Sequence, residues 1–179
     1  MDCMGCKGEI QIMTFKYLTV ILLIMVAFTG CSFINKDTEK NEDYQSPKEY
    51  ATEQSEYIME CIVNKDKEGL KSVFSKHIAE THNLDKEIDE FFEFIDGEII
   101  SYDEPEGYEG GYRMRYGEYT EKVLTGEINN ILTKNGANYS VGMRMYSIYK
   151  ENRDHEGVSI INIIKEGDTL KQCAIGSSY

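Results

Sequence analysis

The chain has 179 residues, which is enough for one domain of ordinary size together with a leader. It carries 32 Asp and Glu residues against 19 Lys and Arg residues, a formal net charge of −13. This charge argues against nucleic-acid binding, whose affinity comes largely from basic side chains that displace counterions from phosphates. It also weakens direct adsorption to anionic lipid headgroups.

An uncharged apolar run covers residues 17–30 and directly follows Lys16. Its length of about fourteen residues falls short of the ~20 that a transmembrane helix needs. The run fits instead the apolar region of a secretory signal peptide, with Lys16 as the positive flank. We therefore predict a signal peptide over residues 1–30, with Met13 as an alternative start of the chain.

Cys31 stands at the end of this run, in the sequence Thr-Gly-Cys-Ser. That sequence resembles the lipobox of bacterial lipoproteins, although Phe28 stands where the family usually has Leu, Val or Ile. The resemblance implies cleavage before Cys31, a diacylglycerol on its sulfur, and an extracytoplasmic protein anchored to the cell membrane of a bacterium. Two alternatives remain open, namely a signal peptide that is cut elsewhere and a plain transmembrane anchor.

The residues after Cys31 divide into a tether and a domain. Residues 32–45 are polar and of mixed charge, so we predict a lipidated cysteine and flexible tether over 31–45 and a folded domain over 46–179. The sequence Ser46-Pro47-Lys48-Glu49 predicts a helix start with a capping box and Pro at the first helical position.

Three helices are predicted from apolar residues at helical spacing. We expect Asn64 and Asn83 to cap the second and third helices, and Asp96-Gly97 to end the third. We also expect Phe91 and Phe92 to pack the third helix on a sheet, with at least one of them fully buried. The three apolar stripes comprise Tyr50, Tyr57, Ile58, Cys61 and Ile62; Leu70, Val73, Phe74, His77 and Ile78; and Leu84, Ile88, Phe91, Phe92 and Ile95.

After residue 97 the apolar period changes to two, which indicates strands. Strands are predicted over residues 98–103, 111–116, 124–133, 139–148, 158–165 and 170–175. The alternation changes phase by one residue between Met145 and Tyr146, which predicts a bulge. Helices followed by strands with short turns predict an α+β fold in which three N-terminal helices pack on a curved antiparallel sheet.

This order of elements resembles the cone-shaped nuclear transport factor 2-like (cystatin-like) fold. The stretches DKEGLKSVFS (66–75) and IDEFFEFIDGEIISYD (88–103) are also similar to a family of bacterial lipoproteins called domain of unknown function 5104. The resemblance implies a fold and a location in the cell envelope, and it carries over no catalytic residues.

No motif for catalysis or metal binding stands out. His82 and His155 fall in predicted loops without the spacing of a metal site, and no calcium loop, nucleophile elbow or phosphate loop is present. His77 lies on an apolar stripe, where a structural role is the favoured interpretation. Cys61 and Cys173 fall on apolar phases as buried thiols, with a disulfide between them as the alternative.

Folds of this class often enclose a pocket between the helices and the sheet. The side chains that we predict to line it, against the alternative of ordinary core, are Tyr102, Tyr116, Tyr139, Met143, Met145 and His77. Two functions remain open: a module that binds a small ligand, a peptide or an envelope protein, and a small hydrolase or isomerase that uses the same pocket. We expect binding, without a cofactor or metal, because His77 is the only ionisable side chain that the sequence places on an apolar face.

Overall fold

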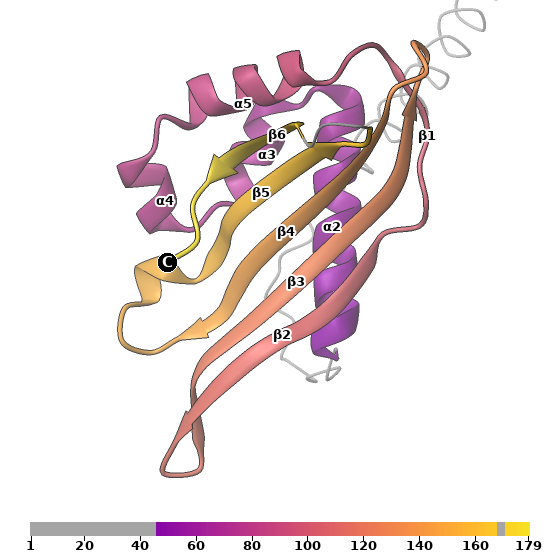
Figure 1. The fold of residues 1–179 in the computed structure, drawn as a ribbon. Coiled ribbons are helices and arrows are strands. Elements are labelled where there is room, and N and C mark those ends of the chain that lie inside the picture. The colour runs from indigo at the N-terminus through magenta and orange to yellow at the C-terminus, as the bar shows by residue number, and fades with distance from the viewer. Residues whose placement is uncertain (1–45, 168–170) are drawn as a thin grey trace, which may run out of the picture. The chain divides into compact units, whose positions relative to one another are not determined.

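The structure is a computed structural model that describes residues 46–167 and 171–179 (Figure 1). The predicted signal peptide, Cys31 and the tether lie outside the described residues. Within those residues, no helix combines the length and the apolar character that crossing a bilayer requires. The elements in chain order are α2 (Pro47–Asn64), α3 (Lys67–Val73), α4 (Lys76–Thr81), α5 (Leu84–Phe94), β1 (Ile99–Ser101), β2 (Glu106–Arg115), β3 (Glu118–Thr133), β4 (Asn138–Tyr149), the 3-10 helix η1 (Arg153–His155), β5 (Gly157–Lys165) and β6 (Lys171–Gly176).

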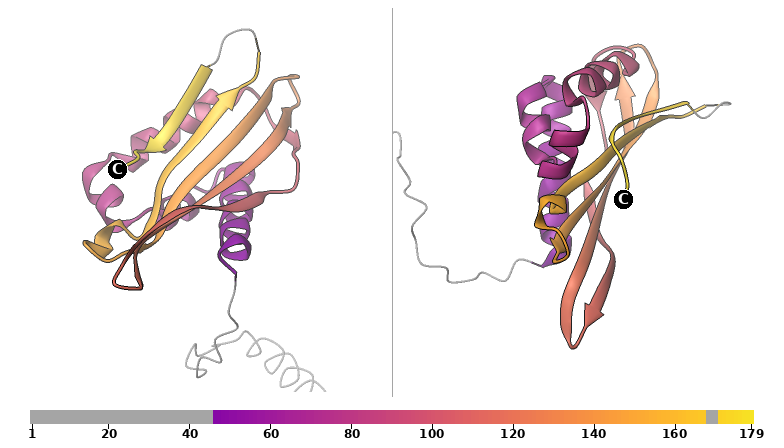
Figure 2. Two further views of the ribbon diagram at one scale, coloured as in Figure 1. Left: turned by 60° about the horizontal axis from the view of Figure 1, so that its bottom comes forward. Right: turned by 90° about the vertical axis from the view of Figure 1, so that its left-hand side faces the viewer.

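The six strands form one antiparallel sheet in the order β1-β3-β4-β5-β6, and β2 also pairs with β3. β1 meets the end of β3 at Leu132 and Thr133, whereas β2 pairs with its first part, over residues 118–127. From β2 to β6, each strand pairs with the next along the chain. The helices cover one face of the sheet (Figure 2). The predicted α+β class with an antiparallel sheet is therefore confirmed.

The start of α2 shows the predicted capping box. The Ser46 Oγ accepts a hydrogen bond from the Glu49 amide at 3.2 Å, and a Glu49 carboxylate oxygen accepts one from the Ser46 amide at 2.9 Å. The hydrogen bond from the Ser46 amide to the Glu49 carboxylate lowers the pKa of Glu49, and the Ser46 side chain adds to this effect. Two amides at the helix end that lack intrahelical partners are thereby satisfied by local sequence alone.

The prediction of a single second helix is wrong, because the chain forms α3 and α4 there and has four helices in its described part. Asp66, and not Asn64, caps α3 by accepting from the Gly69 amide at 2.9 Å. Ser75 then starts α4. The cause of the break is tertiary: the Ser75 amide donates to the Val158 carbonyl at 2.9 Å, so the chain must be extended at that point.

The third predicted helix is α5, and Asn83 caps it as expected, by accepting from the Lys86 amide at 3.3 Å. Phe91 is 0% exposed and belongs to the core, whereas Phe92 is half-buried and packs against the edge of the core. The prediction that at least one of the two would be fully buried is confirmed.

The predicted bulge is also present. Met145 and Tyr146 are adjacent and both are buried, although neighbouring residues of a regular strand face opposite sides. The pairing of β3 with β4 shifts at this point, where Val123 pairs with Tyr146 and Lys122 with Ile148. Met145 joins the core under the helices, and the ring of Tyr146 packs against Tyr179 at 5.3 Å between ring centroids.

Candidate functional site

Three of the predicted pocket residues are core residues. Tyr139, Met143 and Met145 are 0%, 5% and 3% exposed. The Tyr139 hydroxyl donates to the Phe94 carbonyl at 3.2 Å and accepts from the Asp96 amide at 2.9 Å, which fixes the end of α5 on the sheet. These side chains belong to the core, and Met145 also lines an open depression of about 400 Å³ beside Tyr57 and Val73. That they line a ligand pocket stays a prediction.

Two more of the predicted residues lie on the surface and far apart. Tyr102 is 44% exposed just after β1, and Tyr116 is fully exposed in the turn between β2 and β3. They lie at opposite ends of β3, because Ser101 pairs with Leu132 at one end and the turn closes the other. The alternation of apolar residues in β2 predicted one buried and one exposed face. This hairpin extends beyond the helices, so none of the described helices covers either of its faces there (Figure 1).

The sixth residue, His77, belongs to an aromatic cluster. Its ring stacks on that of His155, with 4.2 Å between centroids and 13° between planes. The ring of Tyr149 stacks on His155 at 5.0 Å, and the ring of Tyr179 meets it edge-on at 4.2 Å. The Tyr179 hydroxyl shares a hydrogen bond of 2.8 Å with the Ser75 Oγ. The cluster joins α4, β4, η1 and the last described residue.

The cluster gives His155 a pH-dependent effect on stability. Burial lowers the pKa of His155 below its ordinary value of 6.5, and the adjacent His77 adds to this effect, while Asp154 opposes it. Its Nδ1 is buried without a hydrogen-bond partner among the described residues. The unfolded chain therefore takes up a proton at a higher pH than the folded one, and stability falls as the pH drops below about 6.5.

We expect the melting temperature to fall between about pH 7 and pH 5 in the natural chain and to fall less in His155→Phe, because Phe keeps the stacked ring but cannot be protonated. Thermal unfolding followed by circular dichroism over this range measures the effect. An identical pH slope in the two proteins would contradict it.

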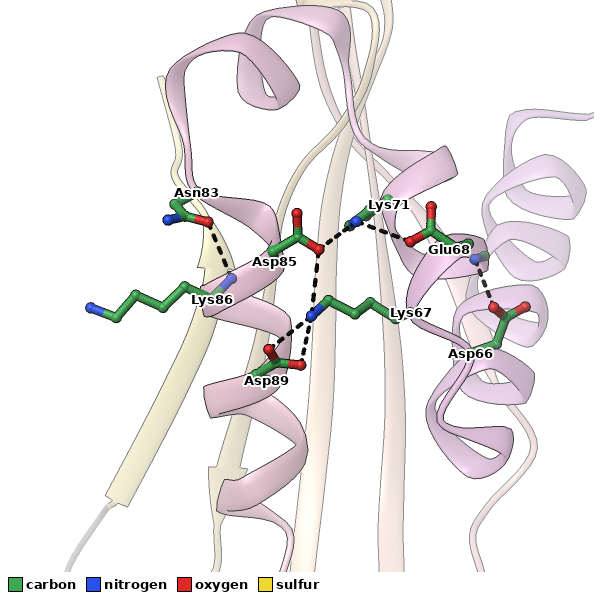
Figure 3. Close-up of polar contacts among 9 residues, drawn as sticks. Asp66, Lys67, Glu68, Lys71, Asn83, Asp85, Lys86 and Asp89 are labelled. Carbon is green, nitrogen blue, oxygen red and sulfur yellow. Dashed lines mark hydrogen bonds and ion pairs between the residues drawn. The ribbon is translucent and has the colours of Figure 1, made fainter.

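The clusters of charged side chains do not form a ligand site. Lys67 lies 2.7 Å from Asp89 and 3.4 Å from Asp85, and Lys71 lies 3.0 Å from Glu68 and 2.5 Å from Asp85, so that the two lysines connect α3 to α5 (Figure 3). The acids are at least 60% exposed, so solvent screens these ion pairs and they contribute little to stability. Among the described residues, no three metal-ligating side chains gather.

The two described cysteines, Cys61 and Cys173, are both free thiols, so the disulfide alternative is not what the structure shows. Burial raises the pKa of each thiol above its ordinary value. A thiol is a weak nucleophile compared with a thiolate, so neither residue has the environment of a reactive cysteine.

A recess of about 400 Å³ lies where the ends of α2 and α5 meet the chain around the start of β1. Its apolar wall comprises Ile62, Val63, Phe92, Ile95 and Ile99, and Lys65, Gly97 and Glu98 complete the lining. Val63 is 41% exposed, while Ile62 beside it is buried. The recess is thus an apolar depression that opens to solvent.

The charges at the recess are unequal. Lys65 caps α2 in the left-handed conformation, with φ of 52°. Within the described residues, no carboxylate lies within 4.0 Å of its ammonium group, whereas the carboxylate of Glu98 lies 3.7 Å from Lys134. An apolar wall beside one uncompensated cation suits a molecule with an apolar body and an anionic end.

Sequence reasoning missed this recess, although two signals pointed to it. The apolar stripe of the third predicted helix is wide, since Phe91 and Phe92 are adjacent and only one of them can point straight at the sheet. Val63 is also apolar, although it lies outside the apolar stripe predicted for α2. Both surplus residues line the recess.

The comparisons with known proteins identify a family for this chain. The family model described as a domain of unknown function (DUF5104) matches residues 56–166, which run from within α2 to just past β5 and include all residues of the recess. No curated protein matches the chain. The match covers more than half of the sequence, and the chain therefore belongs to the DUF5104 family.

Proposed function

We propose that this protein is a lipid-anchored binding module on the outer side of a bacterial cell membrane. A diacylglycerol on Cys31 holds it there, residues 32–45 form the tether, and the domain belongs to the nuclear transport factor 2-like class. The lipobox-like sequence supports the anchor. Helices on one face of a curved antiparallel sheet support the fold class (Figure 2).

The ligand that fits best is a small amphipathic anion bound in the recess. The observation that carries this proposal is the combination of five apolar side chains with the unpaired ammonium group of Lys65, in the described part of the chain. A volume of about 400 Å³ lies within the range of ~300–1,000 Å³ typical of ligand sites. Each methylene group buried there contributes about 0.8 kcal/mol.

Binding is favoured over catalysis by the composition of the interior. Acid–base catalysis needs an ionisable group held at a shifted pKa beside the substrate. Among the described residues, the buried polar side chains are Ser55, Ser75, Thr133 and Ser159, and none of them is an acid or a base. The only ionisable groups at the recess, within that part of the chain, are those of Lys65 and Glu98, at its rim.

Decanoate, a carboxylate with an apolar tail, is a suitable probe. Native mass spectrometry of the purified chain in one fixed detergent is expected to show one bound decanoate. Val63→Asp adds a repelling charge to the wall and is expected to reduce the affinity about tenfold or more, which corresponds to ~1.4 kcal/mol. Lys65→Gln is expected to reduce it less, because the apolar wall remains.

The matched control is Lys48→Gln, which removes an exposed lysine near the other end of α2 and should leave binding unchanged. Because Val63 is 41% exposed, neither test variant should alter thermal unfolding by more than about 0.5 kcal/mol. Equal decanoate binding in the natural chain and in Val63→Asp would show that the recess is not the site.

A further inference from the structure

The hairpin of β2 and β3 exposes four large apolar side chains, of which Tyr112 and Tyr119 meet edge-on with 5.5 Å between ring centroids. Tyr112 is 64% exposed, Met114 47%, Tyr116 100% and Tyr119 40%. Every residue from Glu109 to Tyr119 is exposed, and the hairpin extends past the helices (Figures 1 and 2). Single exposed apolar residues are common, but a group of four on one projecting turn marks an interaction surface.

Tyr116 occupies a turn position whose backbone conformation favours a different residue type. Arg115 pairs with Glu118, so Tyr116 and Gly117 form a two-residue connection, and their φ angles are 54° and 83°. Positive φ at both positions is typical of a type I′ turn, which prefers Asn followed by Gly. A bulky aromatic residue is strained in this conformation. Because Tyr116 is fully exposed, burial of its ring does not offset the strain.

The charge of the turn differs from that of the molecule. Residues 112–117 contain two arginines and no acid, in a chain of net charge −13. Arg113 lies 3.2 Å from Glu121, and Glu118 is paired with Lys150 at 2.7 Å. Arg115 has no carboxylate within 4.0 Å among the described residues. The tip therefore carries one unpaired cation, Arg115, beside its aromatic side chains, and this combination suits the interface of an anionic bilayer.

The hairpin also points to the end of the domain where the tether joins it. Gly107, at the start of β2, packs against the first turns of α2, and its amide donates to the Thr52 Oγ1 at 3.0 Å. Nine residues of extended chain separate Gly107 from Tyr116, about 30 Å. The fifteen residues from Cys31 to Ser46 reach at most ~50 Å. A chain anchored at Cys31 can therefore bring the tip to the same membrane.

We propose that the tip, Tyr112 to Gly117 together with Tyr119, is a second membrane contact. Tyr116 and Met114 enter the headgroup region, and Arg113 and Arg115 meet anionic lipid phosphates. The tip lies away from the recess, so this contact does not depend on ligand binding there. It would hold the domain at the membrane in one orientation, whereas the tether alone would leave the domain free to turn.

The absence of Trp from the chain allows a specific test. Tyr116→Trp and Tyr102→Trp each carry one indole, the first at the tip and the second near the other end of β3, ~50 Å away along the strand. The full chain is reconstituted into vesicles of equal parts phosphatidylcholine and phosphatidylglycerol, with flotation to show that it is bound. Emission wavelength and quenching by brominated lipid are then measured.

The indole of Tyr116→Trp is expected to emit at shorter wavelength and to be quenched at least about twofold more than that of Tyr102→Trp, the matched control in the same anchored chain. Met114→Trp should behave like Tyr116→Trp. Adding Arg113→Gln and Arg115→Gln, or using phosphatidylcholine alone, should lower the quenching of the tip indole toward the control level.

Equal quenching of Tyr116→Trp and Tyr102→Trp in anionic vesicles would overturn the proposal and leave the tip as a surface for a protein partner. Quenching at the tip that does not change when the arginines are replaced would overturn the assignment to anionic lipid. The tip contact rests on the proposed anchor at Cys31. A chain that does not float with the vesicles would reject the anchor, whereas equal quenching in a chain that floats rejects the tip contact alone.

Discussion

Replacing Phe91 with Ala is expected to lower the free energy of unfolding by ~3–5 kcal/mol. The side chain is 0% exposed and lies in the core between α5 and the sheet, so truncation leaves a cavity that the surrounding structure cannot fill. This amount is a large part of the ~5–15 kcal/mol that stabilises a typical domain. Urea unfolding followed by circular dichroism measures the change.

The adjacent Phe92 provides the matched control, because the same substitution removes the same atoms from a half-buried position at the recess. Phe92→Ala is expected to cost about 1 kcal/mol. The slope of free energy against urea should stay the same in both variants, which would show that only stability has changed. Similar costs for the two substitutions would mean that α5 is rotated relative to the packing described above.

Replacing Cys31 with Ala is expected to abolish stable retention in the membrane. Two acyl chains anchor a protein where one does not, since each buried methylene contributes about 0.8 kcal/mol, and Ala offers no sulfur for their attachment. Fractionation of cells that produce the natural chain or the variant measures retention, and the mass of the natural chain should show a diacylglyceryl group and loss of residues 1–30.

Cys173→Ala is the control for this experiment, because it removes a free thiol of the domain and should leave retention unchanged. If the Cys31→Ala protein stays in the membrane fraction at the natural level, the apolar run over residues 17–30 acts as a transmembrane or uncleaved anchor. The lipoprotein part of the proposed function would then be wrong.

Features encoded by neighbouring residues could be predicted from the sequence. The capping box at Ser46 and the cap at Asn83 depend on hydrogen bonds between residues three positions apart. The bulge at Met145 and Tyr146 was visible as a change in alternation. The α+β class followed from the order of these local signals, because helices came before strands that short turns connect.

Features that depend on distant residues could not be predicted. The division of the second helix at Ser75 is caused by a hydrogen bond to Val158, which is 83 residues away in the sequence. The long hairpin of β2 and β3 was underestimated because most of its residues are exposed, so apolar alternation marked only part of it. Helical and strand periodicity therefore indicated the elements but not all of their limits.

The site was predicted less well than the fold. Strand tyrosines and methionines were expected around a central pocket, whereas Tyr139, Met143 and Met145 are core side chains and are at most 5% exposed. The recess lies instead at the helix ends, where its wall combines Val63, Phe92 and other residues from three separate segments. The spacing of residues in the sequence does not predict that these segments come together, because their contact depends on how far each helix extends past the sheet.

The order of the strands has a consequence for how the chain folds. From β2 to β6 each strand pairs with its successor, and the connection between β2 and β3 has two residues while that between β3 and β4 has four. Closing such short loops loses little chain entropy, and isolated hairpins form in ~1–10 μs.

α2 has the opposite character, because its contact with β2 through Thr52 and Gly107 joins residues 55 positions apart. Contacts of high sequence separation form slowly, so we expect the sheet to assemble from its hairpins first and α2 to dock afterwards. The last contacts to form would then lie in the first turns of α2, where the predicted tether enters the domain. A chain already held at the membrane through Cys31 could therefore complete its sheet while the helix nearest the anchor is still free.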